Sequence, residues 1–154
     1  MAFYGGTFTG LPLIWIERFL EFALPFKEQG LISRIRCSTR PDYISSEILS
    51  KIKRLGIDTV EVGIQSFDNN ILKASGRGYS KDIAKYACSL IKGFDLKLGI
   101  QLLPGLPGFN SKTWMEDINQ TIKLGPDMVR IYPCVVLKGT VLEKKIFKKK
   151  NMSH

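Results

Sequence analysis

Glycines and polar side chains follow the apolar segments of this 154-residue sequence. The first such segment, Ala2-Phe3-Tyr4, runs directly into Gly5-Gly6-Thr7. Further residues of this kind come at or just after later apolar segments: Ser38, Thr39, Arg40, Asp42, Gln65, Ser66, Gln101, Pro104, Gly105 and Tyr132. Glycine lets a backbone approach a ligand closely, and hydroxyl and carboxamide groups donate and accept hydrogen bonds. These residue types suit recognition of a polar ligand, although all of them are also ordinary loop residues.

Strand-like segments alternate with segments of helical periodicity along the whole chain. The pattern predicts strands at residues 2–4, 33–39, 58–66, 96–108 (breaking into a Pro/Gly loop) and 127–137, and helices at 13–29, 46–54, 80–93 and 111–125. This alternation is typical of an α/β fold with parallel strands and crossover helices. Ligands of such folds bind at the carboxyl ends of the strands. We therefore expect the polar residues above to gather at one edge of the sheet.

Local signals set the boundaries of three predicted helices. Ser45 or Ser46 can cap the helix at 46–54, and Gly56 can stop it. Ser80 can cap the helix at 80–93. Pro25 should kink or end the first helix, because proline cannot donate the helical hydrogen bond.

Cysteine and histidine are too scattered to predict a metal site. Cys37, Cys88 and Cys134 are odd in number and form no CxxC or CxxxCxxC group. Disulfide pairing is therefore disfavoured, and buried apolar cysteines are the preferred interpretation. His154 is the only histidine and the last residue, which sets aside a histidine-based catalytic or zinc site.

The net charge of +9 comes largely from the end of the chain. Five lysines lie between residues 144 and 150, whereas residues 1–143 carry 18 basic and 14 acidic side chains. A terminal lysine run is more typical of a solvated tail than of a nucleic-acid-binding arm, and both remain open. There is neither an apolar run of about 20 residues nor a signal-peptide pattern. We expect a cytoplasmic protein that does not enter the membrane.

Five sequence blocks, in order, resemble the radical S-adenosylmethionine (radical SAM) superfamily. They are FYGGTF, STRPDYI, VEVGIQSFDNNILKASGRGYS, LGIQLLPGLPG and VRIYPCVVLKGTVLE. The chain is most similar to bacterial relatives of the elongator catalytic subunit, and more distantly to oxygen-independent coproporphyrinogen III oxidases. The resemblance covers residues 2–143. It implies a partial (β/α)6 TIM barrel, a [4Fe-4S] cluster on a CxxxCxxC loop, and S-adenosylmethionine bound to that cluster and cleaved reductively to a radical.

The resemblance implies contacts with S-adenosylmethionine at eight positions. Gly5, Gly6 and Thr7 match the segment whose backbone carbonyls meet the methionine amino group, where side chains would block the approach. Arg77 matches an arginine that pairs with the carboxylate, for which a guanidinium fork is suited. The others are Ser38 at a ligand-facing polar position, Gln65 in contact with the cofactor, Gln101 near the ribose where relatives often carry an acidic residue, and Gly105 beside the adenine.

Ordinary local structure offers other roles for three of these residues. Thr7 could cap the following helix, and Arg77 could be an exposed loop charge. Gln65 could satisfy backbone groups at the end of the barrel. A further difference from relatives is Tyr79, where they often have histidine after Arg-Gly.

The cysteine loop of the family lies upstream of the Gly-Gly block, and this sequence has only Met1 before Ala2. The three cysteines cannot replace the loop, because three thiolates must converge on one cluster. We therefore expect residues 1–143 to be a truncated radical SAM core that lacks the first strand and the cluster loop. We expect residues 144–154, where the resemblance ends, to be a disordered basic tail from a frameshifted, broken or mis-started gene.

These observations lead to one preferred function and three alternatives. The preferred hypothesis is a fragment of a radical SAM enzyme that modifies tRNA nucleosides, inactive alone because the cluster cysteines are absent. Its intact form would need an electron donor as well as tRNA. The alternatives are a non-catalytic S-adenosylmethionine- or nucleotide-binding remnant, a tRNA-binding protein that uses the basic tail, and a radical enzyme acting on a porphyrinogen.

Overall fold

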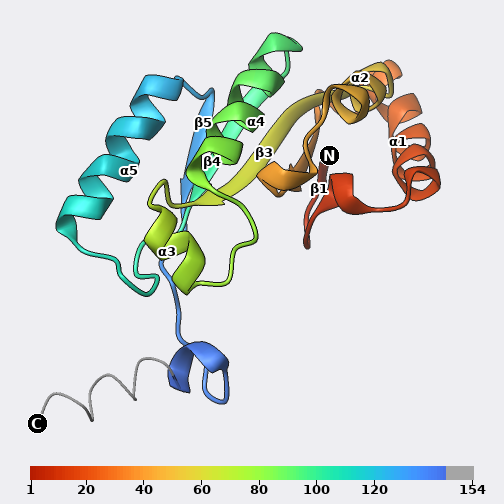
Figure 1. Ribbon diagram of the computed structural model, residues 1–154. Helices are drawn as coiled ribbons and strands as arrows, with labels where there is room; N and C mark the ends of the chain where they lie inside the picture. The colour runs from red at the N-terminus through yellow and green to blue at the C-terminus, as the bar shows by residue number, and fades with distance from the viewer. Residues whose placement is uncertain (145–154) are drawn as a thin grey trace, which may run out of the picture.

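The computed structural model describes residues 1–144 and contains one sheet of five parallel strands in the order β1-β2-β3-β4-β5 (Figure 1). The strands are β1 (Ala2–Phe3), β2 (Ile35–Thr39), β3 (Ile57–Gln65), β4 (Lys97–Leu102) and β5 (Met128–Ile131). Every adjacent pair is parallel, so the predicted alternation of strands and helices is confirmed. Four of the strands are shorter than predicted, including the last, which ends before Tyr132, whereas β3 has the predicted length and is shifted by one residue. The predicted tail at 145–154 lies outside the described residues.

Helices connect these strands. They are α1 (Leu13–Glu28), α2 (Ser46–Arg54), α3 (Asn69–Ala74), α4 (Lys81–Gly93) and α5 (Ser111–Leu124), with 3₁₀ turns at Phe8–Gly10 and Pro41–Tyr43. The sequence did not predict α3, which is only six residues long. Its start is fixed by the Asp68 carboxylate, which accepts hydrogen bonds from the backbone N–H groups of Asn70 and Ile71. No helix of this part of the chain is long and apolar enough to cross a membrane.

Most of the predicted helix signals act as expected. The Ser45 and Ser80 hydroxyls accept hydrogen bonds from backbone N–H groups in the first turns of α2 and α4. Gly56, just beyond α2, has a φ of +89°, a conformation that favours glycine. Of the two effects predicted for Pro25, ending the helix does not occur, because α1 continues past it to Glu28, close to the predicted bound of 29. Proline near a helix end removes a single intrahelical hydrogen bond, and the helix ends three residues later.

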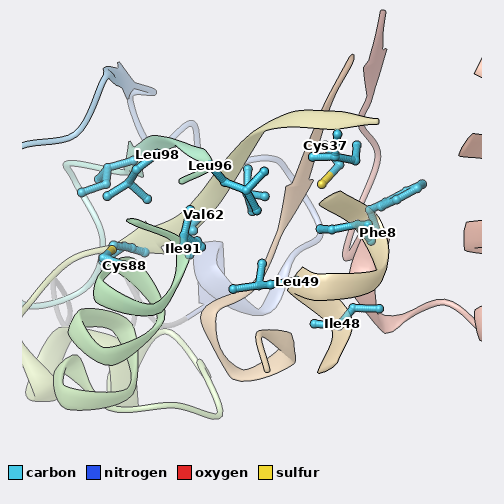
Figure 2. Packing of buried hydrophobic residues seen from close by; sticks show 14 of the residues in the cluster. Phe8, Cys37, Ile48, Leu49, Val62, Cys88, Ile91, Leu96 and Leu98 are labelled. Atoms are coloured by element: carbon cyan, nitrogen blue, oxygen red, sulfur yellow. The ribbon is translucent and has the colours of Figure 1, made fainter. Parts of the chain in front are cut away.

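The helical layer packs on one face of the sheet. Buried side chains on that face include Cys37 of β2, Val62 of β3 and Leu98 of β4, which meet residues such as Leu49 of α2 and Ile91 of α4 (Figure 2). Side chains of a strand alternate between faces. The opposite face therefore carries a different set, which is mostly polar: Arg36, Ser38, Glu61, Gly63, Gly99, Gln101 and Arg130.

Two aspartates fasten the amino ends of the strands in the same way. Asp58 of β3 accepts a hydrogen bond from the Ile35 backbone N–H at 2.8 Å and pairs with Lys27 at 2.7 Å. Asp127, just before β5, accepts from the Leu98 backbone N–H at 2.9 Å and pairs with Lys97 at 2.7 Å. These contacts lower the pKa of Asp127, the lysine hydrogen bond being the largest cause. The strands are thus tied together at the end opposite the predicted ligand edge.

Asp117 anchors α5 to the loop that follows β3. Its side chain is only 2% exposed, and its Oδ1 accepts from both the Ser66 hydroxyl at 3.0 Å and the Phe67 backbone N–H at 2.6 Å. Removal from water raises the pKa of Asp117, and the two hydrogen bonds offset only part of that increase. The ionised form of Asp117 therefore gives a lower free energy of unfolding than the protonated form would.

We expect Asp117→Asn to fold at least as stably as the wild type at pH 7, because one amide oxygen can accept both hydrogen bonds without a buried charge. A raised native pKa means that the folded chain binds the proton more tightly than the unfolded chain. The stabilisation is therefore complete below the ordinary aspartate range near about 3.9 and is lost as the pH rises through the native pKa. Urea unfolding between pH 4 and 8 should show this decline in the wild type and a flatter profile in the asparagine variant. Asp117→Ala should lose about 1–3 kcal/mol, because both donors lose their acceptor.

Candidate functional site

A buried carboxylate lies at the centre of the polar face of the sheet. Glu61 of β3 is 0% exposed. Its Oε1 accepts from the Tyr4 hydroxyl at 2.9 Å and lies 3.4 Å from Nη1 of Arg36. Its Oε2 accepts from Nε2 of Gln101 at 3.0 Å and lies 3.2 Å from Nε of Arg130. Glu61 thus links residues on or next to all five strands, with two partners on each oxygen.

Tyr4 joins the two guanidinium groups of this network. The guanidinium carbons of Arg36 and Arg130 lie 5.5 and 5.2 Å from the centre of the Tyr4 ring. The Tyr4 hydroxyl also accepts a hydrogen bond from Arg130 at 2.8 Å. Partial burial and the hydrogen bond to Glu61 raise the pKa of Tyr4. Because Tyr4 directly precedes Gly5, the network fixes the start of the glycine segment.

Ser38, Gln65 and Gln101 meet at the carboxyl edge of the sheet, as the sequence predicted for ligand-facing residues. Nε2 of Gln101 donates to the Ser38 hydroxyl at 3.2 Å. Gly63 leaves room for both amide side chains: a Cβ built there would lie 2.7 Å from Nε2 of Gln65 and 3.7 Å from Oε1 of Gln101. The absence of a side chain at Gly63 therefore makes room for the Gln65 carboxamide, whereas the distance to Gln101 is an ordinary contact.

Gln65 has an unusual backbone conformation for a residue with a side chain. Its φ is +71°, at the last position of β3 and beside an irregularity in the pairing with β4. Such a conformation stores strain and is found most often at functional sites. The loop that follows supports it, because the Tyr79 hydroxyl donates to the Gly63 carbonyl at 2.7 Å and contacts the Ile64 carbonyl at 3.2 Å. Burial raises the pKa of Tyr79 to about 12, which keeps the hydroxyl protonated as a donor.

Gly5 and Gly6 follow β1 at the same edge and have φ values of +101° and +145°. A Cβ built at either position would meet no protein atom within 4 Å. Their glycine requirement comes from the backbone conformation, and the space beside them is open to a ligand. Thr7 follows at the start of a 3₁₀ turn, where its side chain makes no capping hydrogen bond.

The two other predicted contact residues lie on neighbouring loops. Arg77 lies between α3 and α4, two residues before the buried Tyr79, and its side chain is partly buried. Gly105, with a φ of +93°, is packed against Cys134, whose Cβ would be 3.3 Å from an added side chain. The structure therefore brings Ser38, Gln65 and Gln101 together, and no contact joins Arg77 or Gly105 to that group.

The cysteines do not form a cluster site. Cys37 and Cys88 are buried, and Cys134 is half-buried. Burial raises the pKa of both buried thiols to about 12. The three cysteines lie on separate elements, Cys37 in β2, Cys88 in α4 and Cys134 after β5. Among residues 1–144, no three side chains of the ligating types come together as a metal site. The residues present do not fit a [4Fe-4S] cluster.

Sequence analysis missed Tyr4, Arg36, Glu61 and Arg130 as parts of the site. A signal was available, because Glu61 interrupts a run of apolar residues in DTVEVGIQS. A charged residue in the middle of a buried strand requires charged or hydrogen-bonding partners. Arg36 lies inside β2, next to β3, and Arg130 lies inside β5, which pairs with β4.

Comparison with known proteins gives consistent matches. The family model of the Radical SAM superfamily matches residues 1–121. The chain is 41% identical over 107 residues to a tRNA uridine(34) acetyltransferase of Methanocaldococcus infernus, covering 68% of this chain and 20% of that protein. It is 27% identical to Elongator complex protein 3 of Mus musculus, covering 90% of this chain and 29% of that protein. The chain thus spans less than a third of these two curated relatives.

Solved structures confirm the predicted partial TIM-barrel architecture. The archaeal Elp3 of Methanocaldococcus infernus, with an N-terminal deletion, matches 96% of this chain and 39% of its own, with a TM-score of 0.84 and 30% identity. Coproporphyrinogen III oxidase of Escherichia coli matches 88% of this chain and 32% of its own, with a TM-score of 0.75 and 18% identity. At that identity the second likeness concerns the fold alone.

Gly99 of β4 gives a direct test of the Glu61 network. A Cβ at this position would lie 2.8 Å from Cγ and 3.3 Å from Cα of Glu61, so part of the clash is with backbone. We expect Gly99→Ala to lower the free energy of unfolding by about 1–3 kcal/mol, measured by urea unfolding.

Gly93→Ala is the matched control for that substitution. Gly93 is the last residue of α4, and a Cβ there meets nothing within 4 Å. Alanine should stabilise this position by about 0.4–1 kcal/mol, because it restricts the unfolded chain. Equal stability of the two variants would contradict the close packing of Gly99 on Glu61.

Proposed function

Because the chain belongs to the radical SAM superfamily, we propose that it supplies the S-adenosylmethionine-binding part of an enzyme that modifies a tRNA nucleoside. The observation that carries this proposal is that Ser38, Gln65 and Gln101 lie near the carboxyl ends of β2, β3 and β4, at the edge where the open Gly5-Gly6 segment follows β1. All of these groups lie where parallel α/β folds bind ligands, at the carboxyl ends of the strands.

The residues present fit S-adenosylmethionine. The open backbone at Gly5-Gly6 suits the methionine amino group, since carbonyl oxygens accept from an ammonium group. The carboxamides of Gln65 and Gln101 can bind the hydroxyl and polar groups of a nucleoside. Arg77 would pair with the carboxylate, and the adenine would lie beside the Gly105 backbone on the side away from Cys134, which fills the space of an added Cβ. When bound, S-adenosylmethionine supplies a sulfonium group whose reductive cleavage starts radical chemistry.

The [4Fe-4S] cluster of the superfamily finds no ligands among the described residues, because the three cysteines lie on separate elements and no three ligating side chains come together there. We propose that this chain does not turn over by itself. The cluster, and the electron donor that reduces it, would have to act through residues outside those described. The role of the chain's own side chains is then to bind and orient the cofactor.

tRNA as the substrate is supported by the names of the relatives, which include tRNA uridine(34) acetyltransferases of three microorganisms. Such a role fits a protein of the cytoplasm. A porphyrinogen is the alternative substrate, supported by a 33% identical stretch of 95 residues in an oxygen-independent coproporphyrinogen-III oxidase-like protein of Bacillus subtilis. A non-catalytic binding remnant would make the same contacts with the cofactor. It would differ only in staying inactive even when a segment that holds the cluster is supplied.

We expect the 154-residue chain to bind S-adenosylmethionine in isothermal titration calorimetry, and Gly6→Ala to weaken that binding at least tenfold. The added Cβ meets no protein atom, so it would occupy space needed by the ligand. Gly30→Ala is the matched control, because Gly30 also has a positive φ, +73°, and open surroundings but precedes β2 at the opposite end of the sheet. Absence of binding by the wild type, or equal weakening by the two variants, would contradict the proposed site.

The basic tail gives a separate test of how tRNA is bound. We expect removal of residues 144–154 to leave the affinity for S-adenosylmethionine unchanged within twofold. If the five lysines of this segment contact phosphates, the slope of log affinity for tRNA against log salt should fall by up to about 4. Filter binding at several salt concentrations measures this slope. An unchanged slope would assign tRNA recognition to residues 1–143, and loss of cofactor binding would contradict the assignment of the cofactor site to those residues.

A further inference from the structure

We propose that Glu61 is a positioning residue that fixes the carboxamide of Gln101 so that its oxygen faces the ligand edge and accepts a hydrogen bond from a ribose hydroxyl. This inference rests on the proposed binding of S-adenosylmethionine. It assigns to Glu61 a role in recognition that neither its burial nor its ion pairs alone would require.

The hydrogen-bonding groups of Glu61 and Gln101 differ. A carboxylate has only acceptor sites, whereas a carboxamide has an acceptor oxygen and a donor nitrogen. Gln101 can therefore satisfy Glu61 in one orientation only, with Nε2 directed to Oε2 of Glu61 at 3.0 Å. The same nitrogen also reaches the Ser38 hydroxyl at 3.2 Å, which uses its second hydrogen. Both donor hydrogens of Gln101 are thus taken by the protein.

The carboxamide oxygen of Gln101, Oε1, takes no part in the hydrogen bonds to Glu61 and Ser38. With Nε2 directed to Glu61 and Ser38, Oε1 of Gln101 is left on the Gly63 side, 3.7 Å from where a Cβ of residue 63 would lie. That is the side on which Gln65 also lies. Gln101 therefore presents a neutral hydrogen-bond acceptor of fixed orientation on the Gly63 side of the polar face, two residues from the end of β3.

The side chain of Glu61 is itself held in place by several partners. Arg36 and Arg130 hold its two oxygens, and Tyr4 occupies a further acceptor site. The packing of Gly99 against Cγ and Cα leaves the side chain no room to shift toward β4. A carboxylate held by two hydrogen bonds and two ion pairs cannot rotate without losing a partner. Because the Glu61 carboxylate is fixed, the orientation of the Gln101 carboxamide bonded to it is fixed as well.

The arrangement also explains why an amide suits position 101 here. A glutamate at that position would place a second carboxylate about 3 Å from Glu61, and like charges at that distance repel strongly. Changing both residues together avoids the repulsion. In Glu61→Gln/Gln101→Glu, the amide at 61 donates to the carboxylate at 101, whose oxygens accept from ribose without needing to be oriented.

The test compares S-adenosylmethionine with its 2′-deoxy and 3′-deoxy analogues by calorimetry on the full chain. We expect the wild type to prefer the parent compound over one analogue by about tenfold, the value of a single hydrogen bond. Glu61→Asp withdraws the carboxylate by one methylene and keeps its charge, so this preference should fall to within about twofold. The double exchange Glu61→Gln/Gln101→Glu should restore it. A merely structural role of Glu61 would weaken the binding of all three compounds alike and leave their ratios unchanged, which would overturn the proposal.

A second measurement needs no ligand and holds if a variant folds poorly. In a ¹⁵N-resolved spectrum, the side-chain NH₂ signals of Gln101, identified by their loss in Gln101→Glu, should exchange slowly with water in the wild type and faster in Glu61→Asp. Equal exchange in the two proteins would overturn the proposed orientation, whatever the calorimetry shows. Absence of S-adenosylmethionine binding by a folded wild type would instead contradict the proposed function, and with it the ribose contact.

Discussion

A single carboxylate, that of Glu61, constrains the whole polar face of the sheet. Burying a charge without partners is strongly unfavourable, so Glu61 requires the four groups that surround it. These come from β2, β4 and β5 and from the residue after β1, so the requirement of one side chain fixes the relative placement of every strand. The helical layer stabilises the opposite face by burial of apolar surface, which is not directional. The hydrogen bonds and ion pairs of the polar face are directional, so they determine how the strands are aligned.

The ligand edge depends on this constraint at two points. Tyr4 is held by Glu61 and is covalently continuous with Gly5, so the network sets where the glycine segment begins. Gln101 is held by Glu61 and shares the space above Gly63 with Gln65. The strained backbone of Gln65 is supported by Tyr79, whose hydroxyl contacts the carbonyls of Gly63 and Ile64. The side chains of the site are therefore held in place by their contacts with one another.

The sequence was sufficient for the fold and for part of the site. Periodicity and capping residues such as Ser45 and Ser80 predicted the strands and helices, because these signals are local. The short α3 was missed, since six residues are too few for a periodic pattern. Ser38, Gln65 and Gln101 were named because they were expected at or just past the ends of strands. Gln65 does end β3, whereas Ser38 and Gln101 lie one residue inside β2 and β4, where a hydrogen bond joins them. The contacts of Glu61 join residues up to 69 positions apart, and no local pattern encodes such a distance. Roles assigned through the resemblance, such as that of Arg77, remain predictions that binding experiments can test.

The shortness of β1 has a consequence for how binding and motion are coupled. This strand has two residues and, in the described part of the chain, pairs only with β2. Short edge strands open locally more easily than central ones. The segment that would receive the amino group of the ligand is thus attached to the least protected strand of the sheet. A ligand that binds only the closed edge stabilises it by mass action, so the amide hydrogens shared by β1 and β2 should report cofactor occupancy through their rate of exchange with solvent.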